Sequence, residues 1–107
     1  MVLDRGVYKK TRILGARYID MMLRKQTQLD DGGYVQGFAA WVTNDIGAAE
    51  GPMAKGSFGF GGFWDTYSWA DPEGDFVALL LLQMYPGNEH RIQQKFQNIT
   101  YGIIEDL

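Results

Sequence analysis

Residues 58–83, FGFGGFWDTYSWADPEGDFVALLLLQ, decide the fold because they hold two strand-like runs and the turn that joins them. The turn is DPEGD at residues 71–75, where proline presets φ at the second position and glycine accepts a left-handed conformation. Strand-like residues flank this turn on both sides, so we expect a β-hairpin. Residues 76–84, FVALLLLQM, are apolar without alternation, which predicts a strand buried on both faces at the centre of its sheet.

The segments on either side of this hairpin complete the expected architecture. Residues 12–25 place apolar side chains at helical spacing, although Gly15 disfavours a helix that runs through it. Residues 34–43 are rich in aromatic and β-branched residues, which is typical of a strand, and residues 47–56 are expected to form a loop. A last helix should place four apolar residues on one face: Ile92, Phe96, Ile99 and Ile103. We therefore expect an α+β fold, with a three-stranded antiparallel sheet flanked by helices in the order α-β-β-β-α.

The composition limits the chain to one domain and excludes several classes of protein. Its 107 residues are 46% hydrophobic, which is enough for one core. The absence of cysteine excludes a disulfide scaffold, a zinc ribbon and a thiol nucleophile. The single histidine, His90, should follow the N-cap Asn88 in the first turn of the last helix, as a solvated residue. No apolar run reaches the roughly 18 residues that span a bilayer, so we expect a cytoplasmic protein without membrane contact. The alternative is that a longer parent chain carries an export signal.

Charge is distributed unevenly along the chain. Residues 1–29 carry seven basic and two acidic side chains, residues 30–86 carry one basic and eight acidic ones, and the net charge is −3. A basic end can bind a polyanion, but charged helix faces in water explain the same pattern. We expect no nucleic-acid partner and no cofactor. We also expect no metal site, because the two candidate ligands Asp71 and Asp75 bracket a turn that explains their presence.

Residues 55–63, KGSFGFGGF, interleave glycine with phenylalanine and admit several interpretations. A phosphate loop needs its lysine after the glycines and at the head of a helix, whereas Lys55 precedes them and a strand follows. An RNA-recognition strand would continue with Val-x-Phe after the glycine-aromatic run and would lie on a basic surface, and this chain has neither feature. A bent or bulged strand edge with core aromatic residues fits the same pattern.

Nearby aromatic residues could also stack a sugar ring. They are Trp41, Trp64, Tyr67 and Trp69. Strand alternation places Tyr67 and Trp69 on one face and Trp64 on the other, so we expect most of them to be core residues.

Residues 58–83 also resemble the third-motif region of the serine β-lactamase and penicillin-binding-protein superfamily, in its class C-like esterase branch. That branch shows Phe-Gly-(His, Trp or Tyr)-Gly-Gly, a strand ending in Asp-Pro, a turn, and a hydrophobic strand that closes on Gln. Residues 5–22 resemble the loop and helix before the third strand of that fold, and residues 33–43 resemble its Gly-Tyr-x-x-Gly-Phe strand. The resemblance implies that residues 1–107 are a single partial β-lactamase-like domain, corresponding to the C-terminal third of the fold.

The resemblance also implies a role in acyl transfer. In this family a serine in Ser-x-x-Lys attacks a carbonyl, and the backbone N–H after the third motif stabilises the oxyanion. Carried onto this chain, Phe60, Gly61 and Gly62 occupy the motif, and the Phe63 N–H would be the oxyanion donor. Phe60 departs from the family pattern because its side chain has no polar hydrogen to offer a substrate.

The sequence contains no nucleophile of the family type. Ser57 is followed three residues later by Phe60, and Ser68 by Asp71, so Ser-x-x-Lys is absent. The Tyr-x-Asn motif that assists the serine in this family is also absent, since no tyrosine has Asn two residues later. We therefore expect a fragmentary or truncated serine hydrolase that is not catalytic alone and whose partner is the missing N-terminal portion. The alternative is a non-enzymatic assembly module that forms a homodimer through an exposed sheet edge.

Overall fold

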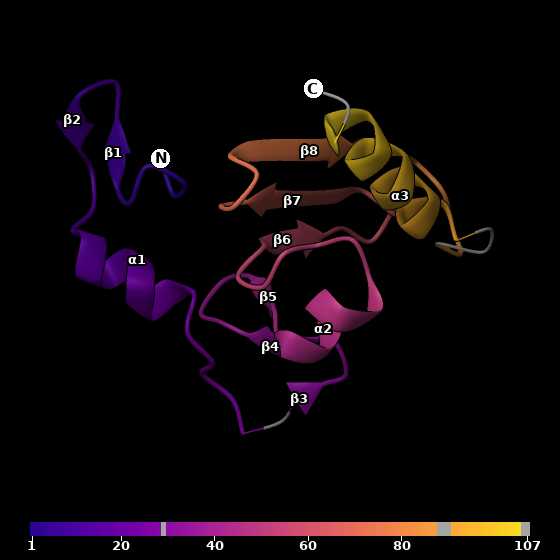
Figure 1. Ribbon diagram of the computed structural model, residues 1–107, viewed down its shortest axis with the longest axis horizontal. Helices are drawn as coiled ribbons and strands as arrows, with labels where there is room; N and C mark the ends of the chain where they lie inside the picture. The colour runs from indigo at the N-terminus through magenta and orange to yellow at the C-terminus, as the bar shows by residue number, and fades with distance from the viewer. Residues whose placement is uncertain (29, 88–90, 106–107) are drawn as a thin grey trace.

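The computed structural model describes residues 1–28, 30–87 and 91–105. In these residues the chain forms a two-stranded hairpin, a six-stranded antiparallel sheet and three helices (Figure 1). The helices are α1 (Ala16–Met22), α2 (Asp45–Glu50) and α3 (Ile92–Glu105). The hairpin strands are β1 (Val7–Tyr8) and β2 (Thr11–Arg12). The sheet strands are β3 (Asp30–Asp31), β4 (Tyr34–Gln36), β5 (Trp41–Thr43), β6 (Phe58–Gly61), β7 (Tyr67–Asp71) and β8 (Phe76–Leu80), hydrogen-bonded in that order.

The expected three-stranded sheet flanked by helices is wrong. β3 is an additional strand, residues 58–71 hold β6 and β7 separated by a turn, and residues 34–43 turn back on themselves. The Gly37 N–H donates to Ala40 O at 2.8 Å, which divides the segment into β4 and β5. Glycine is needed there, because a Cβ would collide with the Met22 carbonyl oxygen. The expected loop at residues 47–56 is also wrong in part, since α2 begins after the N-cap Asn44.

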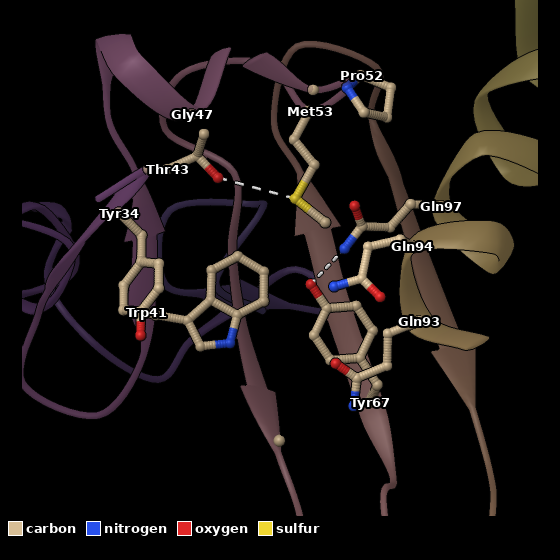
Figure 2. A pocket seen from close by; sticks show the side chains of 13 residues that line it. Tyr34, Trp41, Thr43, Gly47, Pro52, Met53, Tyr67, Gln93, Gln94 and Gln97 are labelled. Atoms are coloured by element: carbon tan, nitrogen blue, oxygen red, sulfur yellow. Dashed lines mark hydrogen bonds between the residues drawn. The ribbon is translucent and has the colours of Figure 1, made fainter. Parts of the chain in front are cut away.

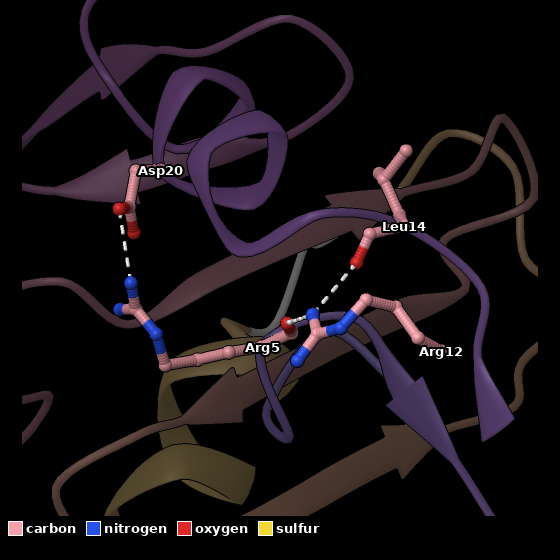
Figure 3. A network of polar contacts seen from close by, with 4 residues as sticks. All are labelled: Arg5, Arg12, Leu14 and Asp20. Atoms are coloured by element: carbon pink, nitrogen blue, oxygen red, sulfur yellow. Dashed lines mark hydrogen bonds and ion pairs between the residues drawn. The ribbon is translucent and has the colours of Figure 1, made fainter.

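The N-terminal segment is less helical than its apolar spacing predicts. Helix α1 begins only after Gly15, and the preceding residues form the β1–β2 hairpin instead. Two arginines make polar contacts within this segment: Arg5 Nη2 donates to Asp20 Oδ2 at 2.9 Å, and Arg12 Nη1 donates to the carbonyl oxygens of Arg5 and Leu14 (Figure 3). Because the Arg5–Asp20 pair is exposed, it contributes little to stability.

The hairpin predicted at residues 71–75 is confirmed, but the position of its second strand is not. β7 pairs with β8 up to the Asp71–Phe76 pair, and Asp71 Oδ1 accepts the N–H groups of Glu73 and Gly74, each at 2.9 Å. β8 is the last strand of the sheet rather than a central one. Its side chains Val77 and Leu79 are 66% and 56% exposed, so the expectation of burial on both faces is wrong.

The two faces of the sheet are covered by different parts of the chain. Helix α3 packs over one face at β8 (Figure 1), where the Trp69 ring lies edge-on to Phe96 at 5.5 Å and parallel to Tyr101 at 6.2 Å. On the opposite face, Phe58 belongs to a core cluster that residues of the N-terminal segment cover. The last helix is confirmed, but its predicted apolar face is wrong, since Ile99 is 61% exposed.

A buried polar chain ties α3 to the β7–β8 hairpin. The Tyr101 hydroxyl donates to Asp71 Oδ2 at 2.5 Å and accepts the Trp69 Nε1–H at 3.3 Å. Burial, and next the neighbouring Asp71 carboxylate, raise the pKa of Tyr101 above its ordinary value. The phenol therefore stays protonated and keeps donating to the buried carboxylate.

We expect Tyr101→Phe to lower the free energy of unfolding by about 1–3 kcal/mol, because it removes a hydrogen bond from the buried oxygen of Asp71. Urea denaturation followed by circular dichroism measures the change. The matched control is Tyr18→Phe, at an exposed position, which should leave the midpoint unchanged. Equal midpoints for both variants would contradict a stabilising role for the Tyr101–Asp71 contact.

Candidate functional site

Alternation along β6 explains the unusual glycine-aromatic stretch. Phe58 and Phe60 lie on the face opposite α3, whereas Gly59 and Gly61 lie on the α3 face beneath neighbouring rings. A Cβ at Gly59 would collide with the Trp41 ring and with the Ser68 carbonyl oxygen. The missing side chain therefore leaves a furrow over β6, into which the Trp41 indole fits.

An aromatic cleft opens above this furrow. The rings of Trp41 and Tyr67 are nearly parallel, with centroids 5.8 Å apart, and lie side by side on its floor (Figure 2). The cleft has a volume of about 430 Å³, within the range of small-molecule sites. Its other lining residues are Gly33, Tyr34, Thr43, Gly47, Gly51, Pro52, Met53, Gly61, Gln93, Gln94 and Gln97. Among the described residues that line the cleft, none is charged, so these residues offer neutral polar groups and apolar surface.

Hydrogen bonds hold the polar groups of the cleft in place. Gln97 Nε2 donates to the Tyr67 hydroxyl at 2.6 Å, and Thr43 Oγ1 donates to Met53 Sδ at 3.8 Å. Burial raises the pKa of Tyr67 to about 12. The Tyr67 hydroxyl is therefore neutral near pH 7 and is unsuited to act as a general base.

The four site residues expected from the sequence lie together in the chain but face different surroundings. Phe60 is 48% exposed and borders a second cavity, of about 390 Å³, on the face opposite α3. Gly61 lines the aromatic cleft. Gly62 lies in the turn to β7, where its N–H donates to Thr66 O at 2.8 Å, and Phe63 beside it is exposed.

The strand edge beside these residues is open. β5 pairs with β6 only at Phe58 and Gly59, so Phe60 and Gly61 pair with β7 alone. Within the described part of the chain, the Phe63 N–H donates to no backbone carbonyl. The edge next to Phe60 and the Phe63 amide can therefore accept an extended ligand backbone.

An aromatic cluster beside this edge was not expected from the sequence. Phe63 stacks on Tyr85 with ring centroids 5.1 Å apart, and Trp64 lies edge-on to Phe63 at 5.3 Å and to Tyr85 at 6.0 Å. The Met84 N–H donates to Trp64 O at 3.0 Å, which fixes the segment after β8 against the β6–β7 turn. Tyr85 lies 22 residues after Phe63, so only a long-range contact reveals the cluster.

Among the described residues, no activating lysine or histidine lies within hydrogen-bonding reach of either serine. Ser57 is fully buried and Ser68 lies within β7. In residues 1–28, 30–87 and 91–105, no lysine or histidine side chain hydrogen-bonds to either hydroxyl; the expected positions of Asn88 and His90 lie outside the described residues. Nor do three His, Cys, Asp or Glu side chains gather into a metal site within the described residues.

Comparisons with protein-family models and with curated proteins find no match to this chain. Among its described helices, none has the length and hydropathy needed to cross a membrane. The geometry of the molecule therefore carries the functional argument.

We expect Gly59→Ala to destabilise the fold by about 1–3 kcal/mol, because the new methyl group overpacks the sheet against the Trp41 ring. The near-ultraviolet circular dichroism of tryptophan should weaken in parallel. Gly102→Ala in α3 is the matched control: a Cβ there meets no atom within 4 Å, so it should stabilise the helix by about 0.5–1 kcal/mol. A Gly59→Ala chain as stable as wild type would contradict the close packing of the Trp41 ring against Gly59.

Proposed function

We propose that the chain is part of a serine β-lactamase/esterase-like acyl-transfer fold, in which it supplies the third-motif strand and one oxyanion donor, and that it is not catalytic alone. The observation that carries the proposal is the open edge of β6 at Phe60 and Gly61, followed by the unpaired Phe63 amide. An acyl group lying along this edge would place its carbonyl oxygen near that N–H. A backbone donor fixed in this way stabilises the charge that develops on a tetrahedral intermediate.

In the proposed acyl transfer, the motif residues have different roles. Gly61 and Gly62 have no side chains to hold a substrate away from the backbone. Phe63 offers its N–H, while Phe60 offers only apolar surface and no hydrogen bond. The nucleophilic serine and its lysine base have to come from outside this chain, because Ser57 is buried and Ser68 has no such base beside it among the described residues.

Exposed apolar surface on both sides of the sheet supports a partial fold. On the face opposite α3, Phe60, Val77 and Leu79 are each about half exposed or more. On the other side, Ile99 and Ile103 of α3 are 61% and 60% exposed. Clustered apolar side chains of this kind mark surfaces that another protein segment covers.

We expect no covalent adduct when the purified chain is incubated with a penicillin and, separately, with a fluorophosphonate. Intact-mass spectrometry gives the readout, and a complete class C-like esterase is the positive control. Nitrocefin and a nitrophenyl ester should show no saturable turnover above background. A stoichiometric adduct on Ser57 or Ser68 would show an activated nucleophile and refute the proposal that the chain is inactive alone.

A second candidate function is assembly into a homodimer through β8. Among the described residues this strand has β7 on one side and no strand on the other, and its five residues carry no charge. Exposed edges usually carry charges that prevent pairing. An antiparallel pair of β8 strands centred on Ala78 would bring Val77 of each copy opposite Leu79 of the other, joining exposed apolar side chains across a two-fold axis.

We expect a concentration-dependent dimer at tens of micromolar in analytical ultracentrifugation, and a monomer for Leu79→Lys, because a charge beside the edge opposes pairing. Ile99→Lys is the control: it places the same charge at a similarly exposed position on α3, away from the β8 edge, and should still dimerise. A wild-type chain that stays monomeric over this range would eliminate the candidate, as would a Leu79→Lys chain that dimerises unchanged.

A further inference from the structure

The aromatic cleft is a candidate ligand site that shares only Gly61 with the proposed acyl-transfer motif. It lies on the α3 face of the sheet, whereas Phe60 points to the opposite face. We propose that this cleft binds a neutral pyranose sugar, with the Trp41 and Tyr67 rings as the stacking floor and the glutamines of α3 as the polar rim. This inference goes beyond the proposed function, since it requires neither a nucleophile nor the Phe63 amide.

The floor of the cleft matches one face of a sugar ring. Trp41 and Tyr67 lie within 14° of parallel and are half-buried, and Figure 2 shows the two rings side by side at the cleft. The face of an aromatic ring carries partial negative charge. The axial C–H groups on a pyranose face carry partial positive charge, so they stack favourably on such a floor.

The rim of the cleft matches the hydroxyl groups at the edge of a sugar. Gln93, Gln94 and Gln97 reach over the cleft from α3 (Figure 2). A carboxamide both donates and accepts hydrogen bonds, as a sugar hydroxyl does. Gln97 is already oriented by its bond to the Tyr67 hydroxyl, and in the described part of the chain Trp41 Nε1 makes no hydrogen bond, which leaves it as a donor.

The charge of the cleft disfavours other ring-shaped ligands. Among the described residues that line it, none is Lys, Arg, Asp or Glu, and the Asp65 carboxylate that accepts from Gln93 Nε2 at 2.5 Å would repel an anion. A nucleotide would lack the cations that bind phosphate, and an acidic sugar would lose hydration without gaining an ion pair. The volume of about 430 Å³ suits one or two sugar rings. These properties together select a neutral sugar.

The test is a titration of the full chain with three neutral disaccharides: maltose, cellobiose and N,N′-diacetylchitobiose. Glucuronic acid is the charged counterpart. We expect at least one disaccharide to give saturable quenching of tryptophan fluorescence with a millimolar dissociation constant. In ¹H–¹⁵N spectra the Trp41 indole N–H and the Gln94 and Gln97 carboxamides should shift, and glucuronic acid should not shift them.

Two variants locate the site. Gln94→Ala should weaken binding about fivefold, as expected for the loss of one net hydrogen bond. Asn98→Ala removes a carboxamide from the same helix outside the cleft and should bind as wild type does. The proposal is overturned if none of the three disaccharides gives a saturable change, or if Gln94→Ala binds as tightly as wild type. Sugar binding does not report on acylation, so neither result affects the hydrolase proposal, which the intact-mass experiment tests separately.

Discussion

The missing side chain at Gly59 is the constraint on which the candidate sites depend. Because nothing projects from β6 there, the Trp41 indole can cross from β5 and lie beside Tyr67 of β7. Beyond Gly59 the pairing with β5 ends, so Phe60 and Gly61 pair with β7 alone. The aromatic floor on the α3 face therefore depends on Gly59, and the open strand edge begins directly after it.

The two faces of the sheet differ in how completely they are covered. Over the α3 face, Trp69 is 1% exposed and the Tyr101–Asp71 hydrogen bond joins the helix to the hairpin. On the opposite face, the N-terminal segment covers Phe58 but leaves Val77 and Leu79 exposed. Both proposals rest on this asymmetry, since each has another segment cover the opposite face, either of a hydrolase or of a second copy.

Local signals predicted the β7–β8 turn and the presence of the last helix, but not the strands within residues 34–43 or the helix α2. The residues 71–75 specify their own turn, because Asp71 accepts N–H groups from within it, and α3 follows from helical periodicity. Composition predicts one strand over residues 34–43, but the turn at Gly37 depends on close approach to the Met22 carbonyl, a contact that composition does not encode. The glycine-aromatic run predicted a close backbone approach, but not which ring would make it.

The sequence by itself determined the β7–β8 hairpin, the last helix and the absence of Ser-x-x-Lys, because each depends on residues close together in the chain. Only the tertiary structure decided that β8 lies at the edge of a six-stranded sheet. An unbroken apolar run is compatible with a central strand and with an edge strand awaiting a partner, and pairing alone distinguishes them. The cleft likewise required Trp41, Tyr67 and Gln97 to meet from three elements, so its position follows from packing between distant segments.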